Sequence, residues 1–393
     1  MKLPSPFTMD YVRHFYLSNL LHLTFYSGFY LIYLRSLGLT DGQIGLLLGL
    51  SLILVALLEV PTGIVADKIS KKASVLLSKA LLIPGTLLFY LAHSFPDVIL
   101  ATIFNSLSLA FLTGAETGWL YELLSRDGRE KDYPRVYGRL RAFEMAGSFI
   151  GTVVGGFMAD SLGMRLAVLV SLPFTVLSML VLATVPADTA RSGVSYGRHL
   201  LESLRLIRNS PEVLWLFVYA NVIGLPLTAF TSFMQLYFYG VMASVLVVSW
   251  ISAGYTLISG LSWYVDFGGN IRATLYRYSP AMIPALTLLA GLNGYLGFLT
   301  LVLGSLVFAQ AFKEWQGRFQ RAIPDEKRAT IGSFYSLFTA ILNGTLNVLI
   351  GRLYGRVGIM EGLIMVSLFF LGVGFLILLR GAKKDSQSLI LLK

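Results

Sequence analysis

Long apolar stretches, separated by short polar ones, run along nearly the whole chain. About twelve of them are long enough to cross the roughly 30 Å hydrocarbon core of a membrane as α-helices. The pattern therefore predicts an all-α integral membrane protein with twelve transmembrane helices. We expect these spans near residues 11–36, 41–66, 73–93, 97–124, 136–160, 164–185, 212–239, 243–265, 273–292, 296–318, 329–354 and 359–379.

The composition agrees with burial in lipid. Of 393 residues, 55% are hydrophobic and 13% are charged, about half the charged share of a soluble domain. The absence of cysteine excludes disulfides, thiolate metal sites and cysteine catalysis. The first apolar stretch follows Lys2 and has no small-residue cleavage site, so we expect it to be retained as a span.

The distribution of positive charge predicts the orientation. If the N-terminus is cytoplasmic, 27 of the 31 Lys and Arg residues fall at the inner side. Cytoplasmic loops of membrane proteins carry such an excess of Lys and Arg. We therefore expect a multi-pass protein of the cell membrane with both termini in the cytoplasm. The net charge of +10 then follows from topology, and no nucleic-acid partner is implied. The four exceptions are Arg35, Arg165, Arg352 and Arg356.

A weak internal repeat divides the chain in half. The segments Gly156–Gly163 and Gly351–Gly358 carry glycines at matching places 195 residues apart. Two parallel six-helix halves leave such a repeat. We expect an N-terminal half at 1–187, a cytoplasmic linker with an amphipathic helix at 188–211, and a C-terminal half at 212–393.

The end of the second predicted span carries a charged motif. Glu59, Gly63 and Asp67 are spaced four apart and share one helix face. A carboxylate at a helix C-terminus lies at the unfavourable end of the helix dipole. We therefore expect Asp67 to have a cation or another helix N-terminus as its partner. The motif ends in the lysines Lys68, Lys71 and Lys72.

Gly63-xxx-Asp67-Lys68-xx-Lys71-Lys72 resembles the loop signature between helices 2 and 3 of the major facilitator superfamily. Ser70 stands where that family commonly has glycine. The preceding Glu-Val-Pro-Thr-Gly resembles a prokaryotic branch of the same superfamily. The resemblance implies two six-helix halves that rock about a central site for a small-molecule substrate.

The fifth predicted span carries a stripe of small residues on which another helix can pack closely. The stripe also resembles the span-5 motif of proton-driven antiporters in the superfamily, with Thr152 in place of the motif's proline. That resemblance favours export, whereas ordinary helix packing is the alternative interpretation. The stripe consists of Gly147, Gly151, Gly155 and Gly156.

Glu116 lies inside the fourth predicted span. A charge at the bilayer centre costs about 3 kcal/mol, so intramembrane carboxylates are candidates for function. Burial disfavours the ionised form, which makes Glu116 a candidate for proton exchange or substrate contact. A structural hydrogen bond between helices is the alternative. Further candidates are His22 and Asn19 in the first span, with His22 able to share a proton with Glu116, and Gln235 and Gln310 in spans 7 and 10.

A second layer of charge lies at the inner ends of the spans. Alternating salt bridges among these residues would hold the cytoplasmic side closed, as a gate. Solvated charges at headgroup level are the alternative. The layer comprises Glu59, Asp67, Lys79, Glu122, Arg139, Arg141, Glu144 and Arg328.

These observations predict a secondary active transporter that works by alternating access as a monomer, with proton-coupled efflux as the favoured direction. No cofactor is expected, and no phosphate-binding glycine loop of an ATP-driven pump is present. The alternatives are an uptake carrier or facilitator for a sugar, nucleoside or organic anion, and a lipid translocator. From other classes they are a membrane receptor without transport and an enzyme acting on lipids.

Overall fold

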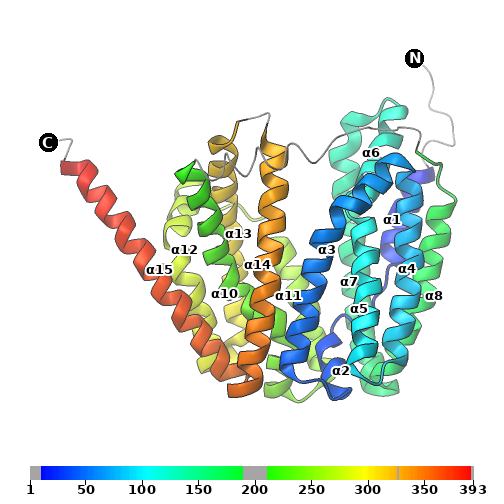
Figure 1. The fold of residues 1–393 in the computed structure, drawn as a ribbon, viewed down its shortest axis with the longest axis horizontal. Helices are drawn as coiled ribbons and strands as arrows, with labels where there is room; N and C mark the ends of the chain where they lie inside the picture. Colours follow the sequence, from blue (N-terminus) through cyan, green and yellow to red (C-terminus); the bar gives the residue numbers. More distant parts are fainter. Residues whose placement is uncertain (1–9, 189–209, 325–326, 391–393) are drawn as a thin grey trace. The chain divides into compact units, whose positions relative to one another are not determined.

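The structure is a computed structural model that describes residues 10–188, 210–324 and 327–390 (Figure 1). Within these ranges it contains helices and no β-strand, which confirms the predicted all-α class. The amphipathic linker helix predicted within 188–211 lies outside the described residues, apart from the ends of that segment.

The chain divides into two compact units. The first comprises Met1–Val194 and Ser244–Ala253, and the second comprises Ser195–Ala243 and Gly254–Lys393. The helices of the first unit are α1 (Asp10–Leu21), α2 (Tyr30–Ser36), α3 (Asp41–Lys68), α4 (Lys71–Leu91), α5 (Phe95–Leu112), α6 (Ala115–Arg126), α7 (Tyr133–Leu162) and α8 (Met164–Ala183). Those of the second unit are α10 (Pro211–Met242), α12 (Gly269–Leu292), α13 (Gly297–Ala322), α14 (Arg328–Val357) and α15 (Ile359–Ile390), while α11 (Val245–Ser262) contributes residues to both.

Among the described residues, ten helical segments are long and apolar enough to cross a membrane. They coincide with ten of the twelve predicted spans. The remaining two predicted spans are occupied by α1 together with α2, and by α12. The expectation of one continuous helix over 11–36 was wrong, because α1 ends at Leu21 and α2 begins only at Tyr30.

Local sequence explains where several helices begin. Thr40 and Gln43 form a capping box at the start of α3, in which each side chain accepts a hydrogen bond from the other residue's backbone N–H. Ser210 accepts a hydrogen bond from the N–H of Val213, and Pro211 occupies the first turn of α10, where no N–H is needed.

The glycine repeat marks matching helix ends. Gly163 follows α7 with φ 94° and Gly358 follows α14 with φ 97°. Glycine adopts this left-handed region without a Cβ penalty, which allows the next helix to start at once. The two glycines, 195 positions apart in the sequence, therefore make the same turn.

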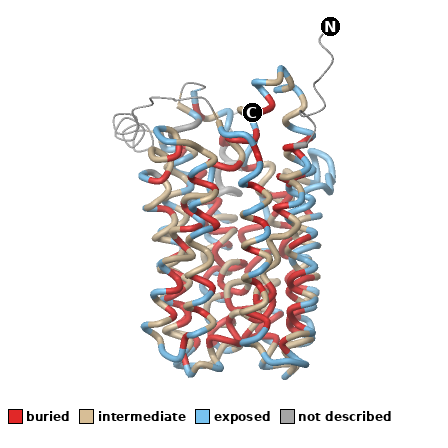
Figure 2. The backbone as a smooth tube through the Cα atoms, turned by 90° about the vertical axis from the view of Figure 1, so that its right-hand side faces the viewer, coloured by how far each residue is buried: buried red, intermediate tan, exposed pale blue. Residues whose placement is uncertain are grey.

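Many residues along the helices are exposed (Figure 2), and a large number of these are apolar. Phe157 on α7 is 63% exposed, and Phe369 on α15 is 67% exposed. Large exposed apolar surfaces are unusual on soluble monomers, but they suit helices that face lipid. Buried polar residues include Asn19, Lys79 and Glu116.

Candidate functional site

The first span of the first unit is broken at residues 22–29 (Figure 1). The chain there turns through short-range backbone hydrogen bonds, and the N–H of Phe25 is held by the Ser171 hydroxyl of α8 at 3.1 Å. Irregular backbone at membrane depth is tolerated only where protein covers it or where it lines a cavity. Such breaks form ion and substrate sites in many transporters.

The glycine stripe of α7 packs against this break. A Cβ on Gly155 would lie 1.7 Å from the carbonyl oxygen of Phe25, and one on Gly147 would lie 2.7 Å from that of Leu20. Gly151 similarly faces Thr24. The stripe thus gives room to irregular backbone that a larger side chain would displace.

Thr152 stands where the antiporter motif has proline, and α7 runs unbroken through it. Its hydroxyl donates to the carbonyl oxygen of Ser148 at 2.7 Å and lies 2.7 Å from the hydroxyl of Ser27. The adjacent Gly156 faces Ser249, where a Cβ would lie 2.4 Å from the serine Cβ. The hydrogen bond between the Thr152 and Ser27 hydroxyls thus connects α7 to the broken segment.

Glu116 lies in the first turn of α6, directly after a second break at Gly114, which has φ 77°. The side chain is buried, and its Oε1 accepts a hydrogen bond from Asn19 Nδ2 at 2.9 Å. The same Asn19 amide group donates to the carbonyl oxygen of Phe15 at 3.0 Å, which fixes its orientation. The positive end of the α6 dipole favours a carboxylate at this position.

Lys79 completes a buried polar cluster with these residues. Its Nζ lies 2.7 Å from His22 Nδ1. The carboxylates of Glu116 and Glu144 attract its ammonium group electrostatically. We name Asn19, His22, Lys79 and Glu116 the buried cluster. Lys79, which the sequence places in the inner-end charge layer, is only 3% exposed, and its ammonium group contacts His22.

His22 was expected at mid-depth of a continuous helix. It instead follows the last residue of α1, and its ring contacts Lys79. Asn19, rather than His22, is the described residue of this span that contacts the Glu116 carboxylate.

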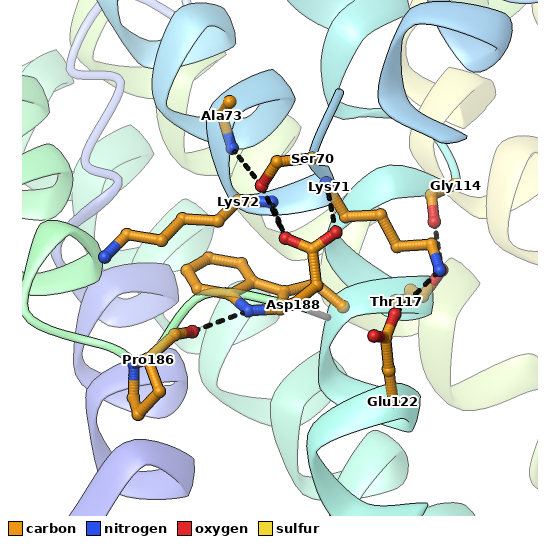
Figure 3. Close-up of polar contacts among 10 residues, drawn as sticks. Ser70, Lys71, Lys72, Ala73, Gly114, Thr117, Glu122, Pro186 and Asp188 are labelled. Atoms are coloured by element: carbon orange, nitrogen blue, oxygen red, sulfur yellow. Dashed lines mark hydrogen bonds and ion pairs between the residues drawn. The ribbon is translucent and has the colours of Figure 1, made fainter. Parts of the chain in front are cut away.

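One ion pair joins two residues of the predicted gate motif. Lys71 Nζ, at the start of α4, lies 3.0 Å from Glu122 Oε2 of α6, and both side chains are largely buried (Figure 3). Gly118 on α6 leaves space for the Lys71 stem. Partly buried pairs of this kind are sensitive to loss of one partner.

Other members of the predicted gate motif lie apart from this pair. Arg141 pairs with Glu144 three residues later at 2.5 Å, with both side chains nearly half exposed. Such an exposed pair contributes little to stability. Lys68 and Arg139 are exposed, whereas Glu59, Gly63 and Asp67 are half-buried.

Asp188, which was not predicted, caps the N-terminus of α4. Its carboxylate accepts hydrogen bonds from the hydroxyl of Ser70 and from the N–H groups of Lys71 and Lys72, at 2.5, 2.7 and 3.1 Å (Figure 3). Ser70 also accepts from the N–H of Ala73. The residue that departs from the family's glycine is therefore the N-cap of α4. The carboxylate at this helix N-terminus is Asp188 rather than Asp67.

The cap holds the end of α8 against α4. Lys72 Nζ donates to the carbonyl oxygens of Ala183 and Val185 at 2.7 and 2.6 Å. Trp119 Nε1 donates to the carbonyl oxygen of Pro186 at 3.0 Å. Hydrogen bonds thus connect the start of α4, at Ser70 to Lys72, with the segment that follows α8.

Replacing Asp188 by Asn should weaken this cap. Burial raises the pKa of Asp188, but the hydrogen bonds from Ser70, Lys71 and Lys72 outweigh it and hold the pKa below its ordinary value of 3.8. The stabilisation is therefore present at neutral pH and is lost as the pH falls through that lowered pKa. Loss of a capping side chain costs about 1 kcal/mol, so we expect amide exchange at the start of α4 to become roughly fivefold faster.

Hydrogen exchange followed by mass spectrometry of peptides covering residues 70–75 measures this effect. The matched control is Asp160→Asn, which removes an exposed carboxylate near the C-terminus of α7. This variant should leave the exchange of these peptides unchanged. Equal protection in the Asp188→Asn variant and the wild type would show that the cap contributes nothing.

The second unit contains a separate cavity of about 270 Å³. Its lining combines aromatic rings with hydroxyl groups, from Gly224, Leu227, Thr228, Thr231, Tyr255, Ser259, Trp263, Ser305 and Phe308. Gln310 lies outside this lining, buried, and donates to the carbonyl oxygens of Ser262 and Val265. Gln235 is half-buried on α10.

Sequence reasoning also missed a polar row on α14. Asn343 and Asn347 are four residues apart and therefore share a helix face. Their side-chain oxygens are buried and have no hydrogen-bond partner within the described chain. The Asn343 amide group donates to the carbonyl oxygen of Thr339 at 2.9 Å. Buried unsatisfied acceptors of this kind suit contact with water or substrate.

Membrane-length helices that carry a half-length repeat, with charged groups buried beside breaks in two spans, define the chain as a multi-pass membrane transporter. The family model of the Major Facilitator Superfamily matches residues 15–344, and the chain belongs to that family. The resemblance to this superfamily is thereby confirmed, as is the interpretation as a transporter rather than an enzyme.

Among curated proteins, the chain is similar to the quinolone resistance protein NorA of Staphylococcus aureus (strain Mu50). The two are 26% identical over 129 residues, which cover 33% of this chain and 32% of NorA. The matched segment thus spans about a third of the length of the curated relative.

Solved structures share the fold over nearly the whole chain. The nucleoside transporter NupG superposes with a TM-score of 0.69 at 17% identity, covering 95% of this chain and 98% of NupG. A bacterial homolog of the human lysosomal transporter Spinster, inward-facing and unoccupied, superposes with a TM-score of 0.72 at 14% identity, covering 95% and 96%. At these identities the likeness shows the fold alone.

Proposed function

We propose that this transporter exports a small amphipathic molecule in exchange for protons. It would act as a monomer in the cell membrane, with both termini in the cytoplasm and no nucleic-acid partner. The observation that carries the proposal is the buried Glu116 carboxylate, held by Asn19 and attracted by Lys79 beside the broken first span.

The cluster offers two charge states with different preferred packing. Ionised Glu116 is stabilised by the Asn19 amide, by the N-terminus of α6 and by the Lys79 cation. Protonation of Glu116 removes the partner charge of a buried lysine, and an unpaired buried charge is costly. A proton therefore shifts the balance between arrangements of α1, α4 and α6, which is the requirement for coupling.

Two further observations support export. The sequence match to NorA concerns a protein named for quinolone resistance. The antiporter-like stripe of α7 packs directly on the break that carries His22 at its start. The stripe would thus link the geometry of the broken span to the rest of the first unit.

Proteoliposomes that contain a pH-sensitive dye test the proposal under an imposed proton gradient. A panel of amphipathic compounds that includes a quinolone would be added to wild type, to Glu116→Gln and to the control Asp160→Asn. We expect at least one compound to drive proton movement in the wild type and the control, with about 100-fold less in Glu116→Gln, as for loss of an essential proton-transfer group. Compound flux without proton movement in all three would indicate a facilitator and overturn the coupling.

A further inference from the structure

A second groove in the C-terminal unit differs from the cavity described above. It is formed by the N-terminal parts of α10 and α12 and the C-terminal half of α15, with a volume of about 410 Å³. The charge distribution of the sequence assigns these helix ends to the cytoplasmic side. The groove is lined by Trp215, Tyr219, Tyr276, Arg277, Ile377, Leu378 and Arg380.

Two other grooves of the same unit show what an ordinary lipid-facing hollow looks like here. One is lined only by Leu, Ile, Val, Met and Phe side chains of α14 and α15, and the other only by apolar residues including Phe267 and Leu303. Acyl chains suffice to fill such surfaces. The groove at Arg277 and Arg380 differs from them because it adds two guanidinium groups and three aromatic rings.

The aromatic wall of this groove is fixed by contacts behind it. The rings of Tyr219 and Tyr276 stack at 4.2 Å. The Tyr219 hydroxyl lies 2.8 Å from that of Ser279 and donates to the carbonyl oxygen of Tyr276. The guanidinium of Arg318 lies 4.5 Å from the centre of the Tyr276 ring and is itself paired with Glu314. Because these contacts fix the rings of both Tyr219 and Tyr276, the aromatic wall is preorganised for a ligand.

The position of the groove suits a molecule with a charged end and an apolar end. Trp and Tyr gather at the membrane–water boundary. The side chains of Arg277 and Arg380 are exposed there, and the lining residues that the structure describes include no acidic one. The Arg277 guanidinium also lies 5.8 Å from the centre of the Tyr278 ring. Arginine recognises phosphate through paired N–H groups. Ile377 and Leu378 on α15 offer the adjoining apolar surface.

We propose that this groove binds an anionic phospholipid of the cytoplasmic leaflet, with the phosphate between Arg277 and Arg380 and an acyl chain along Ile377 and Leu378. Basic pockets between helices on the cytoplasmic side recognise such headgroups. The proposal stands whether the transporter exports or imports its substrate.

Native mass spectrometry of the purified full chain measures binding of phosphatidylglycerol and of phosphatidylcholine with matched acyl chains. We expect the wild type to prefer phosphatidylglycerol by about 25-fold, since two basic residues near an anionic lipid contribute roughly fivefold each. Arg277→Gln/Arg380→Gln should reduce that preference to about the level of phosphatidylcholine. Arg352→Gln/Arg356→Gln removes the same charge from exposed positions on α14 and should keep the preference.

Two further measurements keep the result interpretable. Arg277→Lys/Arg380→Lys retains the charge and should keep part of the preference, which separates recognition from misfolding of the glutamine variant. Inorganic phosphate is added as a competitor. An unchanged preference in Arg277→Gln/Arg380→Gln would overturn the proposal, and so would displacement of the lipid by millimolar phosphate, because the site would then bind a soluble anion.

Discussion

Gly155→Ala is expected to destabilise the protein by about 3 kcal/mol, at the upper end of what overpacking costs. A Cβ at this position would lie 1.7 Å from the carbonyl oxygen of Phe25, which is backbone and cannot rotate away. Either α7 or the broken segment must then move. Because the segment begins at His22, we expect transport to fall together with thermal stability.

The control lies in the same helix. Gly138 has no heavy atom within 4 Å of an added Cβ, and alanine is favoured over glycine inside a helix by about 1 kcal/mol. Gly138→Ala should therefore be neutral or stabilising. Melting temperatures of both variants in detergent, measured by fluorescence, check the prediction. Equal melting temperatures would show that α7 does not pack closely on the break.

Hydropathy predicted the span positions because residues that face lipid must be apolar, whether the backbone at that point is helical or irregular. The breaks at 22–29 and at Gly114 escaped prediction for the same reason. Each lies within a stretch that is apolar on average, and no proline marks the first. What permits the break is the space left by Gly147, Gly151 and Gly155, which lie more than 100 positions away in the sequence.

The candidate site divides in a similar way. The sequence alone shows a carboxylate within an apolar span, so Glu116 could be identified as a candidate. Asn19 and His22 could be identified from their positions in the first span. Lys79 could not be separated from the nearby loop lysines, although about 1.5 Å of rise per residue carries it two turns further into α4 than Lys71. Asp188 was hidden because its partner Ser70 lies 118 positions earlier.

Removing the buried cation should have an effect as large as that of Gly155→Ala. In Lys79→Met the side chain keeps its length but loses its charge, so Glu116 loses an attractive partner. Lys79 and Glu116 attract one another without a direct ion pair, and leaving a buried charge without its compensating charge costs about 3 kcal/mol. We expect a matching fall in thermal stability and loss of proton-coupled transport. Lys131→Met, which changes an exposed lysine, should alter neither.

The double variant Lys79→Met/Glu116→Gln separates stability from coupling. With neither charge left alone, most of the lost stability should return, because a neutral pair is tolerated where a single buried charge is not. Glu144, the other carboxylate that attracts Lys79, keeps Arg141 as a partner at 2.5 Å. Proton movement in proteoliposomes should stay absent. Stability that fails to recover would show that the two charges act independently, and recovered proton coupling would place the proton site elsewhere.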